Sequence, residues 1–527
     1  MNYDFFDFIK NIILHKIYIL LLININHMKA ATITLTVILL FSLQLSSQQT
    51  SDMLEEVLGS VVTVAVYKMD ESETAKILGY GTTRGDEENA EMAYAMALDL
   101  SGSLGTGSGF MVRNNGVDYI ITNAHVVEKA SNEEGSIFVH SINRTKYEMK
   151  LIGGDTFYDI AVLGFVTPPG PELTPVEFRK TDARIGEKVY AIGNPGGKYP
   201  YSISDGIVSA MNRMTSGITG KFGFLQSTAT VIWGNSGGPL LDLNGKVVGI
   251  NSQLGYIEGP DDELYIQPQI NLALEADIAE RIFYDILKNN GRVIRGYIGI
   301  EISEKNFTDN RAKSFMNPKH TVDSLPVLSG VIPESPAFSK LNDKIGYNLL
   351  SVNNVNVFNI DEVLRELEKI KPGQSVNLTL QKNRESLNVT VNAIELGEKE
   401  LRSIAEYIIE KDDRINLQAN SRPVNISLTT NHSYKYSKYE NKKFNTIHGG
   451  YHAPEYIIVA AGLITKQGST TWRISNTSDL GAAFRISGLQ GVIDLRVKDA
   501  NNPYSEPATL RFDLSDERYI SKSALWY

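Results

Sequence analysis

The sequence contains no cysteine in its 527 residues, which excludes disulfide bonds, thiol nucleophiles and cysteine-bound metals. Basic residues are also in deficit, since 51 Lys and Arg face 61 Asp and Glu and the formal net charge is −10. This balance disfavours a general nucleic-acid binder, because phosphate contacts require basic patches. Of only 8 histidines, His448 and His452 lie four apart in "HGGYH", whose glycines break a helix. We therefore expect no metal site and no other cofactor.

The rest of the composition is that of a folded, globular chain. Hydrophobic residues make up 42% and charged residues 21%, as in ordinary globular proteins. The length favours several domains of about 100–200 residues each.

The first fifty residues predict a targeting segment. They contain two apolar runs, Asn11–Asn24 and Ala31–Leu45, and the second follows Met28 and one lysine and leads into small and polar residues. This order is typical of a secretory signal, and the run is shorter than the ~20 residues of a membrane-spanning helix. We expect export to the periplasm or cell envelope with cleavage near Ser46–Gln48. An uncleaved membrane anchor is the alternative, and a translation start at Met28 stays open.

Short β-type runs dominate the next part of the chain, which we place at residues 51–290. They alternate with glycine-containing turns from Gly105 to about Leu254, a pattern that predicts an antiparallel barrel or sandwich. A polar, acidic stretch at residues 69–104 interrupts the pattern and reads as a loop insertion. Residues 272–290 have apolar spacing near 3.6 and predict a connecting helix.

Two smaller segments follow. Residues 291–397 contain strands, a helix at Ile360–Ile370 and a hairpin that turns at Asn383–Arg384. Residues 398–527 begin with a helical pattern and continue with alternating strands, which predicts a small β-rich domain of unknown role.

Three residues far apart in the chain have the chemistry of a serine hydrolase. His125 lies near the end of the strand "YIITNAHVV", Asp159 directly precedes the apolar "IAVL", and Ser236 lies among glycines in "GNSGG". A neighbouring imidazole can take the serine proton, and a carboxylate behind the ring fixes the tautomer. Asp155 is a rival carboxylate; we prefer Asp159 because an acid beside a buried strand requires a partner.

The glycines around Ser236 also predict an oxyanion hole. They allow a tight turn that directs the N–H groups of Gly234 and Ser236 toward a developing negative charge, and Asn235 is a third candidate donor.

Several ordered motifs resemble the HtrA/Deg family of trypsin-like serine proteases. They are "GTGSGF", "TNAHVV", "DIAVL", "AIGNPGG", "GIVSA" and "GNSGGPLLDLNGKVVGIN". The resemblance implies a mainly β fold, in which a chymotrypsin-like double β-barrel with the triad His125, Asp159 and Ser236 precedes an α+β PDZ domain at 291–397. It also implies ATP-independent cleavage of unfolded or damaged envelope proteins, chaperone-like holding, and homotrimers or multiples of trimers.

The resemblance extends to a peptide-binding loop. "GYIGIEI" is similar to the carboxylate-binding loop of a PDZ domain, whose consecutive amides receive a peptide C-terminus while the next strand pairs with the peptide. The residues are Gly296, Tyr297, Ile298, Gly299 and Ile300. A plain strand with a glycine bulge is the alternative.

The sequence before Ser236 departs from the family pattern, because Thr228 and Ile232 stand where members commonly have an acidic residue and an asparagine, and Trp233 directly precedes Gly234. We expect Val231 and Ile250 to line the substrate pocket, where no acid is present, so that a small apolar P1 residue fits. Arg213 lies in the loop that the family uses to relay PDZ occupancy, although an ordinary exposed arginine is equally consistent.

Two other functions remain open at this stage. The chain would be a PDZ-bearing chaperone or scaffold if the barrel does not cleave, and a regulatory protease if it cleaves one envelope partner. Ser236→Ala separates the first from an enzyme, and a peptide-library profile identifies the second.

Overall fold

The computed structural model describes residues 14–16, 48–68, 83–84, 103–131, 133–195, 199–213, 223–258, 264–303, 325–411, 415–417, 424–428, 455–465, 468–487, 492–502, 504, 508–513 and 524–527. Met1–Val57 form one unit and Leu58–Tyr527 another. In the first unit the described residues are helical, and nearly all of the predicted targeting segment lies outside them. None of the helices that the structure describes has the length and apolar character needed to cross a bilayer.

The first six-stranded barrel closes around a core of branched aliphatic side chains. β1 is "VVTVAV", all of it buried, as expected for β-branched residues in a closed sheet. The core includes Val64, Met111, Ile120 and Leu163. The strands follow one another in the order β1 (Val61–Val66), β3 (Gly105–Asn114), β4 (Val117–Thr122), β7 (Ile160–Phe165), β6 (Lys146–Asp155) and β5 (Ile137–His140), and β5 pairs with β1.

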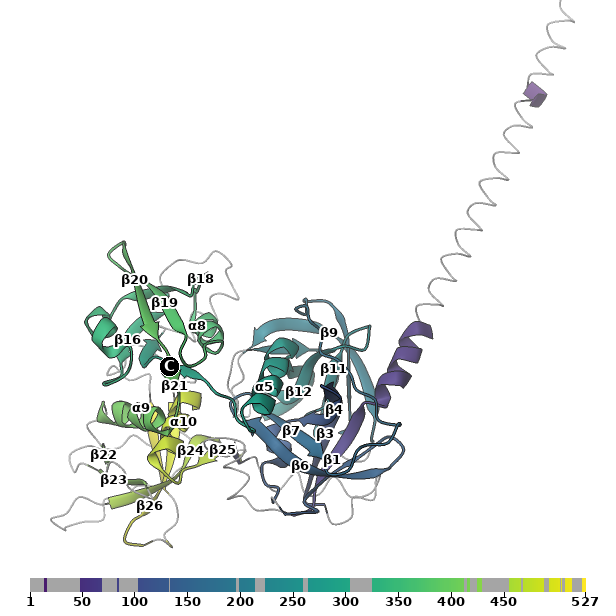
Figure 1. Cartoon of the computed structure of the whole chain (residues 1–527), viewed down its shortest axis with the longest axis horizontal. Coiled ribbons are helices and arrows are strands. Elements are labelled where there is room, and N and C mark those ends of the chain that lie inside the picture. The colour runs from purple at the N-terminus through teal and green to yellow at the C-terminus, as the bar shows by residue number, and fades with distance from the viewer. Residues whose placement is uncertain are drawn as a thin grey trace, which may run out of the picture. The chain divides into compact units, whose positions relative to one another are not determined.

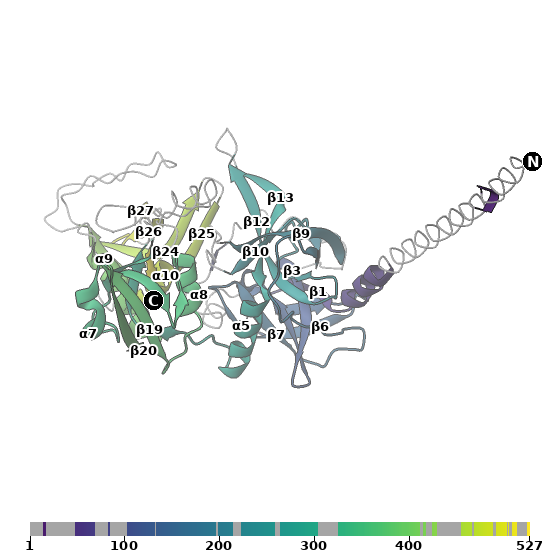
Figure 2. The same ribbon diagram turned by 90° about the horizontal axis from the view of Figure 1, so that it is seen from above.

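A second six-stranded barrel packs its own core, which includes Val189, Leu225 and Leu240. Its order is β10 (Phe224–Ser227), β13 (Leu264–Glu275), β12 (Val247–Glu258), β11 (Pro239–Leu241), β8 (Lys188–Gly193) and β9 (Ser202–Arg213). β12 and β13 form a long hairpin that projects beyond the barrel (Figure 2). The two closed barrels confirm the predicted mainly β, chymotrypsin-like double-barrel fold.

Helix α5 (Ala276–Lys288) follows the second barrel and packs on both barrels, against β12 and β13 and against β6 and β7 (Figure 1). It begins later than the helix predicted from residue 272, because β13 continues through Glu275. Residues 272–275 have helical periodicity in the sequence, but they pair with β12 and so continue the strand.

The 291–397 segment contains a mixed arrangement of strands and short helices. The strands are β14 (Gly296–Tyr297), β15 (Ile300–Ser303), β16 (Val327–Val331), β17 (Asn348–Val352), β18 (Val355–Asn356), β19 (Ser375–Lys382), β20 (Glu385–Asn392) and β21 (Ile394–Glu395). The helices are α7 (Phe338–Leu341), the 3₁₀ turn η2 (Asn342–Lys344) and α8 (Ile360–Leu367). The predicted hairpin is confirmed, with φ values of 51° and 70° at Asn383 and Arg384.

The C-terminal segment combines a sheet with two packed helices, α9 (Glu398–Glu410) and α10 (Thr477–Ser487). Its strands are β22 (Ile415–Leu417), β23 (Val424–Leu428), β24 (Glu455–Thr465), β25 (Gly468–Arg473), β26 (Val492–Asp499) and β27 (Ala508–Asp513). Strand β2 (Thr83–Arg84), from the 69–104 insertion, pairs with β25. The last strand, β28 (Ala524–Trp526), instead joins β15 of the 291–397 segment. Helix α10 has no counterpart in the sequence-based expectations.

Candidate active site

His125 and Asp159 lie in direct contact in the first barrel. His125 is on the short helix α4 (Ala124–Val127), and its Nδ1 is 2.7 Å from Asp159 Oδ2. The main-chain N–H of His125 donates to Asp159 Oδ1 at 3.0 Å. An ionised carboxylate only accepts hydrogen bonds, so Nδ1 carries the proton and Nε2 is left as the acceptor. This is the tautomer that a general base requires.

The turn before β7 aims Asp159 at this histidine. Asp159 has φ of 58°, a left-handed conformation that aspartate tolerates better than most residues. Asn123 Nδ2 donates to its carbonyl at 2.7 Å. The rival Asp155 instead accepts the Tyr158 amide at 3.1 Å and pairs with Arg295, away from His125. The structure thus places Asp159, and not Asp155, behind the imidazole.

Ser252 is a further residue at this carboxylate, and sequence reasoning missed it. Its hydroxyl donates to Asp159 Oδ2 at 2.8 Å from strand β12 of the second barrel. Ser252 lies two residues after Ile250, one of the predicted pocket residues, and no short motif marks it. The Asp159 side chain therefore receives hydrogen bonds from both barrels.

Burial and charge act on His125 in opposite directions. Burial alone lowers the pKa of the imidazole, but the Asp159 carboxylate, its hydrogen bond and the charge of Glu128 together raise the pKa above 6.5. The side chain keeps 34% of its surface exposed, which leaves the ring accessible to a substrate.

Ser236 lies in a loop that packs against the strand and turn before His125. Its carbonyl accepts the Ser108 amide at 2.8 Å, and the Ser108 hydroxyl donates to the Gly234 carbonyl at 2.6 Å. Gly237 has φ of 85°, and a Cβ there would lie 2.4 Å from Thr122 Oγ1 and 2.9 Å from the Asn123 nitrogen. Only glycine permits this approach, which brings the serine loop to the histidine segment.

No hydrogen bond joins the Ser236 hydroxyl to His125 in the described part of the chain. Such contacts are often long in ligand-free hydrolases and tighten with substrate.

Two amides of the loop have no acceptor in the part of the chain that the structure describes. A turn closes where the Asn235 amide donates to the Ile232 carbonyl at 3.1 Å, and Gly234 within it has φ of 95°. Positive φ at the third residue is typical of a type II turn. The N–H groups of Gly234 and Ser236 have no acceptor among the described residues. Asn235 was predicted as a third oxyanion donor, but its amide closes this turn instead.

The residues predicted to line the substrate pocket expose almost no surface to a P1 side chain. Val231 is 3% exposed and packs in the second barrel's core, and Ile250 is fully buried. This part of the prediction is wrong. The exposed apolar side chains beside Ser236 are instead Ile232 and Trp233, at 38% and 49%.

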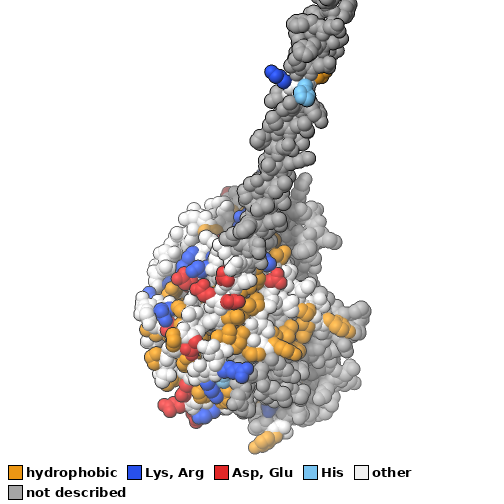
Figure 3. Space-filling view, turned by 90° about the vertical axis from the view of Figure 1, so that its right-hand side faces the viewer, with side chains coloured by type: hydrophobic (Ala, Val, Ile, Leu, Met, Phe, Trp, Pro, Cys, Tyr) orange, Lys and Arg blue, Asp and Glu red, His pale blue; other side chains and the backbone are white. Residues whose placement is uncertain are grey.

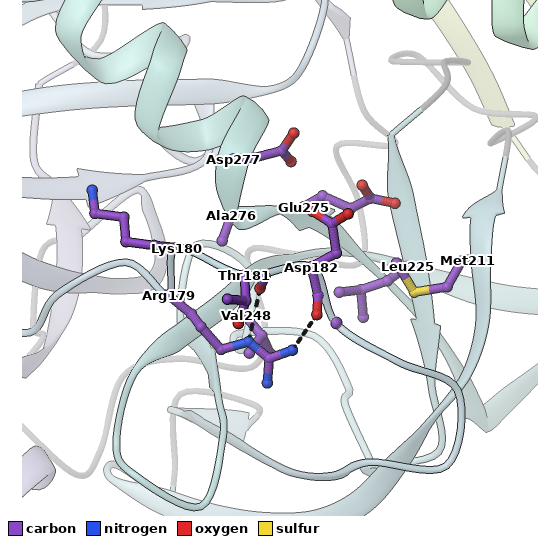
Figure 4. A pocket seen from close by; sticks show the side chains of 11 residues that line it. Arg179, Lys180, Thr181, Asp182, Met211, Leu225, Val248, Glu275, Ala276 and Asp277 are labelled. Atoms are coloured by element: carbon purple, nitrogen blue, oxygen red, sulfur yellow. Dashed lines mark hydrogen bonds between the residues drawn. The ribbon is translucent and has the colours of Figure 1, made fainter.

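A separate cavity lies away from the triad and encloses about 330 Å³, counting its open mouth. Figure 4 shows the Arg179 guanidinium directed at the main chain, where it donates to the Thr181 and Asp182 carbonyls at 2.9 and 2.5 Å. The lining is Arg179, Lys180, Thr181, Asp182, Ala183, Met211, Leu225, Val248, Glu275, Ala276 and Asp277. Because Arg179 also pairs with Glu187 at 2.8 Å, this cluster holds a loop together.

The surface drawn in Figure 3 is mixed in character. Described acidic and basic side chains are interspersed there, with apolar side chains in separate groups among them. Such a face lacks the single-sign field that would concentrate a polyanion.

The amides of the predicted peptide-binding loop donate in two directions, some within the 291–397 segment and some to the segment at the edge of β15. Gly296 donates to the Ile370 carbonyl at 2.9 Å, and Gly296 and Tyr297 form β14, which pairs with β21. Ile298 is buried, and its carbonyl accepts the Ala337 amide. The amides of Gly299 and Ile300 are directed at the edge of β15, where they donate to the main-chain oxygen of Tyr527.

Arg213 ends strand β9, where it is in register with Phe224. The relay assigned to it remains a prediction. His448 and His452 lie outside the described residues.

Comparisons with known proteins show which families and proteins this chain is similar to. A family described as "Trypsin-like peptidase domain" matches residues 107–250. A probable periplasmic serine endoprotease DegP-like from Halomonas elongata is 34% identical over 285 residues, 54% of this chain and 55% of that protein. The chain thus spans about half the length of this relative.

Serine endoprotease DegS from Salmonella typhimurium is 33% identical over 293 residues, 55% of this chain and 76% of that protein. The solved HtrA-type protease AlgW with tripeptide covers 66% of this chain and 97% of its own, at 22% identity and TM-score 0.48. On its sequence relatives, the chain belongs to the HtrA family of trypsin-like serine endoproteases.

Proposed function

We propose that the chain is an exported, ATP-independent serine endopeptidase that cleaves unfolded or damaged envelope proteins through an acyl-enzyme. The observation that carries the proposal is the 2.7 Å contact between His125 Nδ1 and Asp159 Oδ2, next to a serine loop in which two amides have no acceptor among the described residues. A serine endopeptidase requires a histidine whose Nε2 can accept the serine proton, and N–H donors already placed to bind the oxyanion.

In acylation, Ser236 Oγ attacks the scissile carbonyl carbon while its proton moves to His125 Nε2. The carbonyl oxygen gains negative charge and is bound by the N–H groups of Gly234 and Ser236. The imidazolium is stabilised by Asp159, which remains ionised and is held by Ser252. The C–N bond then breaks, the leaving amine takes the proton from Nε2, and the acyl group stays on Ser236.

In deacylation, water replaces the amine. His125 Nε2 removes a proton from the water as its oxygen attacks the ester carbon, and the same two amides bind the second oxyanion. The ester bond breaks, Ser236 Oγ recovers the proton, and the new carboxyl end leaves. No cofactor takes part in this sequence.

The 291–397 segment supplies peptide binding in this proposal. As a PDZ domain it receives peptide C-termini by strand addition to β15, with the Gly299 and Ile300 amides at the carboxyl end. The DegP-like relative is named periplasmic, and the signal-like N-terminus fits the same envelope location. Homotrimers or multiples of trimers complete the proposal.

The test compares hydrolysis of labelled, unfolded casein by the purified chain and by Ser236→Ala. We expect steady hydrolysis without ATP by the first and a loss of at least 10³-fold by the second, because removing the nucleophile leaves only binding and the oxyanion donors. Equal, negligible turnover in both would refute the enzyme and favour a PDZ-bearing chaperone or scaffold. A peptide-library profile with one sharp sequence preference would favour a regulatory protease.

A further inference from the structure

The edge of the proposed peptide groove is already paired, and its partner is the same chain. Strand β28 (Ala524–Trp526) lies antiparallel to β15, with Glu301 opposite Trp526 and Ser303 opposite Ala524. Beyond it, the Tyr527 amide donates to the Ile300 carbonyl at 2.8 Å. The main-chain oxygen of Tyr527 accepts two amides, from Gly299 at 2.9 Å and from Ile300 at 2.8 Å. This is the arrangement of a peptide held by strand addition, with the Tyr527 main-chain oxygen in a nest of amides.

The side chain of Tyr527 fills a pocket that fits a phenol. Tyr527 is 1% exposed, and its hydroxyl donates to Glu368 Oε1 at 2.8 Å. The guanidinium of Arg485 lies 4.5 Å from the centre of its ring, a cation–π contact. A phenylalanine would keep the ring contact and leave the Glu368 oxygen without its hydroxyl donor.

The polar walls of this pocket are themselves buried and paired. Glu368 is 2% and Arg485 4% exposed, and Arg485 donates to Glu368 Oε1 at 2.8 Å. Arg295 donates to both Glu368 oxygens, at 3.1 and 2.9 Å, and to Asp155 at 2.8 Å. Burial alone raises the pKa of Glu368, but Arg295, Arg485 and Arg281 outweigh it and lower the pKa to about 2. The pocket therefore presents a fixed carboxylate to an incoming hydroxyl.

We propose that the segment Ala524–Tyr527 is the resident ligand of the groove, which an external peptide must displace, and that the groove selects peptides with tyrosine at the position of Tyr527. This inference rests on the proposed peptide-binding function and goes beyond it by naming the ligand class and the occupant. The main-chain hydrogen bonds supply affinity without regard to sequence. The Glu368 carboxylate and the Arg485 guanidinium supply the preference for tyrosine.

A tethered ligand weakens binding of a free one in proportion to its local concentration. A ligand segment in the same chain as its site reaches an effective concentration on the order of 1 mM. A free peptide with a Kd of roughly 10 µM for the empty groove would then bind the intact chain about 100-fold more weakly. The hydroxyl donates to a charged group, so its loss costs roughly 10- to 100-fold in affinity.

The experiment uses the full chain carrying Ser236→Ala, so that peptides are not cut, and the same chain lacking residues 524–527. Fluorescence anisotropy follows a labelled peptide with the sequence of residues 520–527, ISKSALWY, and its matched control ISKSALWF. We expect the shortened chain to bind ISKSALWY about 100-fold more tightly than the intact chain, and to prefer it over ISKSALWF by at least tenfold. Equal affinity of both chains overturns the resident ligand, and equal affinity for both peptides overturns the tyrosine pocket.

Tyr527→Phe in the intact chain keeps the result interpretable if the shortened chain does not fold. We expect the amides of Gly299 and Ile300 to exchange slowly with deuterium in the intact chain and at least tenfold faster in Tyr527→Phe. Rapid exchange of both amides in the intact chain overturns the inference. If neither chain binds either peptide while the chain with Ser236 intact still hydrolyses casein, the peptide-binding part of the proposed function fails and the inference with it. Loss of hydrolysis alone refutes only the enzyme.

Discussion

Replacing Asp159 by asparagine tests how the site controls the proton on His125. The carboxylate accepts three hydrogen bonds, from His125 Nδ1 at 2.7 Å, from the His125 amide at 3.0 Å and from Ser252 at 2.8 Å. Asparagine has one acceptor oxygen and one NH₂ group. If the oxygen faces Nδ1, the NH₂ group opposes the His125 amide, donor against donor.

The other orientation satisfies the hydrogen bonds and disables the base. The amide oxygen accepts the His125 N–H, and the NH₂ group donates to Nδ1, which moves the ring proton to Nε2. Nε2 then cannot accept the Ser236 proton. We expect kcat/KM to fall on the order of 10⁴-fold, equivalent to about 5 kcal/mol, with little change in thermal stability.

The assay is hydrolysis of casein or of a cleaved peptide across pH 5–9. In the wild type, the raised pKa of His125 means that activity falls as pH drops through a value above 6.5. Without the Asp159 charge the pKa decreases, so the acid limb of any residual activity moves to lower pH. Ser252→Ala is the matched control, since it removes one hydrogen bond from the same oxygen but keeps charge and tautomer; we expect roughly a tenfold loss. If a folded Asp159→Asn variant retained more than a tenth of kcat/KM, this reasoning would be refuted.

Three further predictions concern the oxyanion loop, the buried cluster and the groove helix. Gly234→Ala strains a residue at φ of 95°, so we expect kcat to fall about 100-fold as the turn reorients its amide, with a smaller change in KM; unchanged kcat would exclude this amide as a donor. Glu368 has its pKa lowered from 4.5 to about 2 by folding, so its contribution to stability is present above pH 4.5 and is lost as pH falls toward 2. In denaturant titrations at several pH values, the unfolding free energy of Glu368→Gln should fall less between pH 4.5 and 2 than that of the wild type. The same pH profile in both proteins would contradict the role of Glu368 in the ion cluster. Asn359 caps α8 by accepting the Glu362 amide at 2.9 Å, so Asn359→Ala should cost about 1 kcal/mol of unfolding free energy, measured by the same titration, and no loss would argue against the cap.

The sequence was informative where chemistry is local and short. Gly234, Ser236 and the apolar strand after them share one stretch, and the motifs around His125 and Asp159 are equally compact. Their order pointed to a triad, and their resemblance to the HtrA/Deg family implied the double barrel. The choice of Asp159 over Asp155 followed from the cost of an unpaired acid beside a buried strand, and the hydrogen bonds place Asp159 at His125.

The contacts that could not be predicted join residues far apart in the sequence. Ser252 reaches Asp159 from the other barrel across 93 positions, and nothing near it in the chain marks it. Val231 was expected in the pocket, but it packs inside the barrel core. The contact between Tyr527 and Glu368 joins residues 159 positions apart. Such contacts are set by how strands close into sheets, which local periodicity does not encode.

The central claim is that folding activates Ser236 through His125 and Asp159. The most direct measurement is labelling of the purified chain with a fluorophosphonate, with the adduct located by peptide mass spectrometry. We expect one adduct, on Ser236, formed rapidly in the wild type, absent in Ser236→Ala and at least 10³-fold slower in Asp159→Asn. A folded wild-type chain that forms no adduct, or forms it at another residue, would contradict the claim.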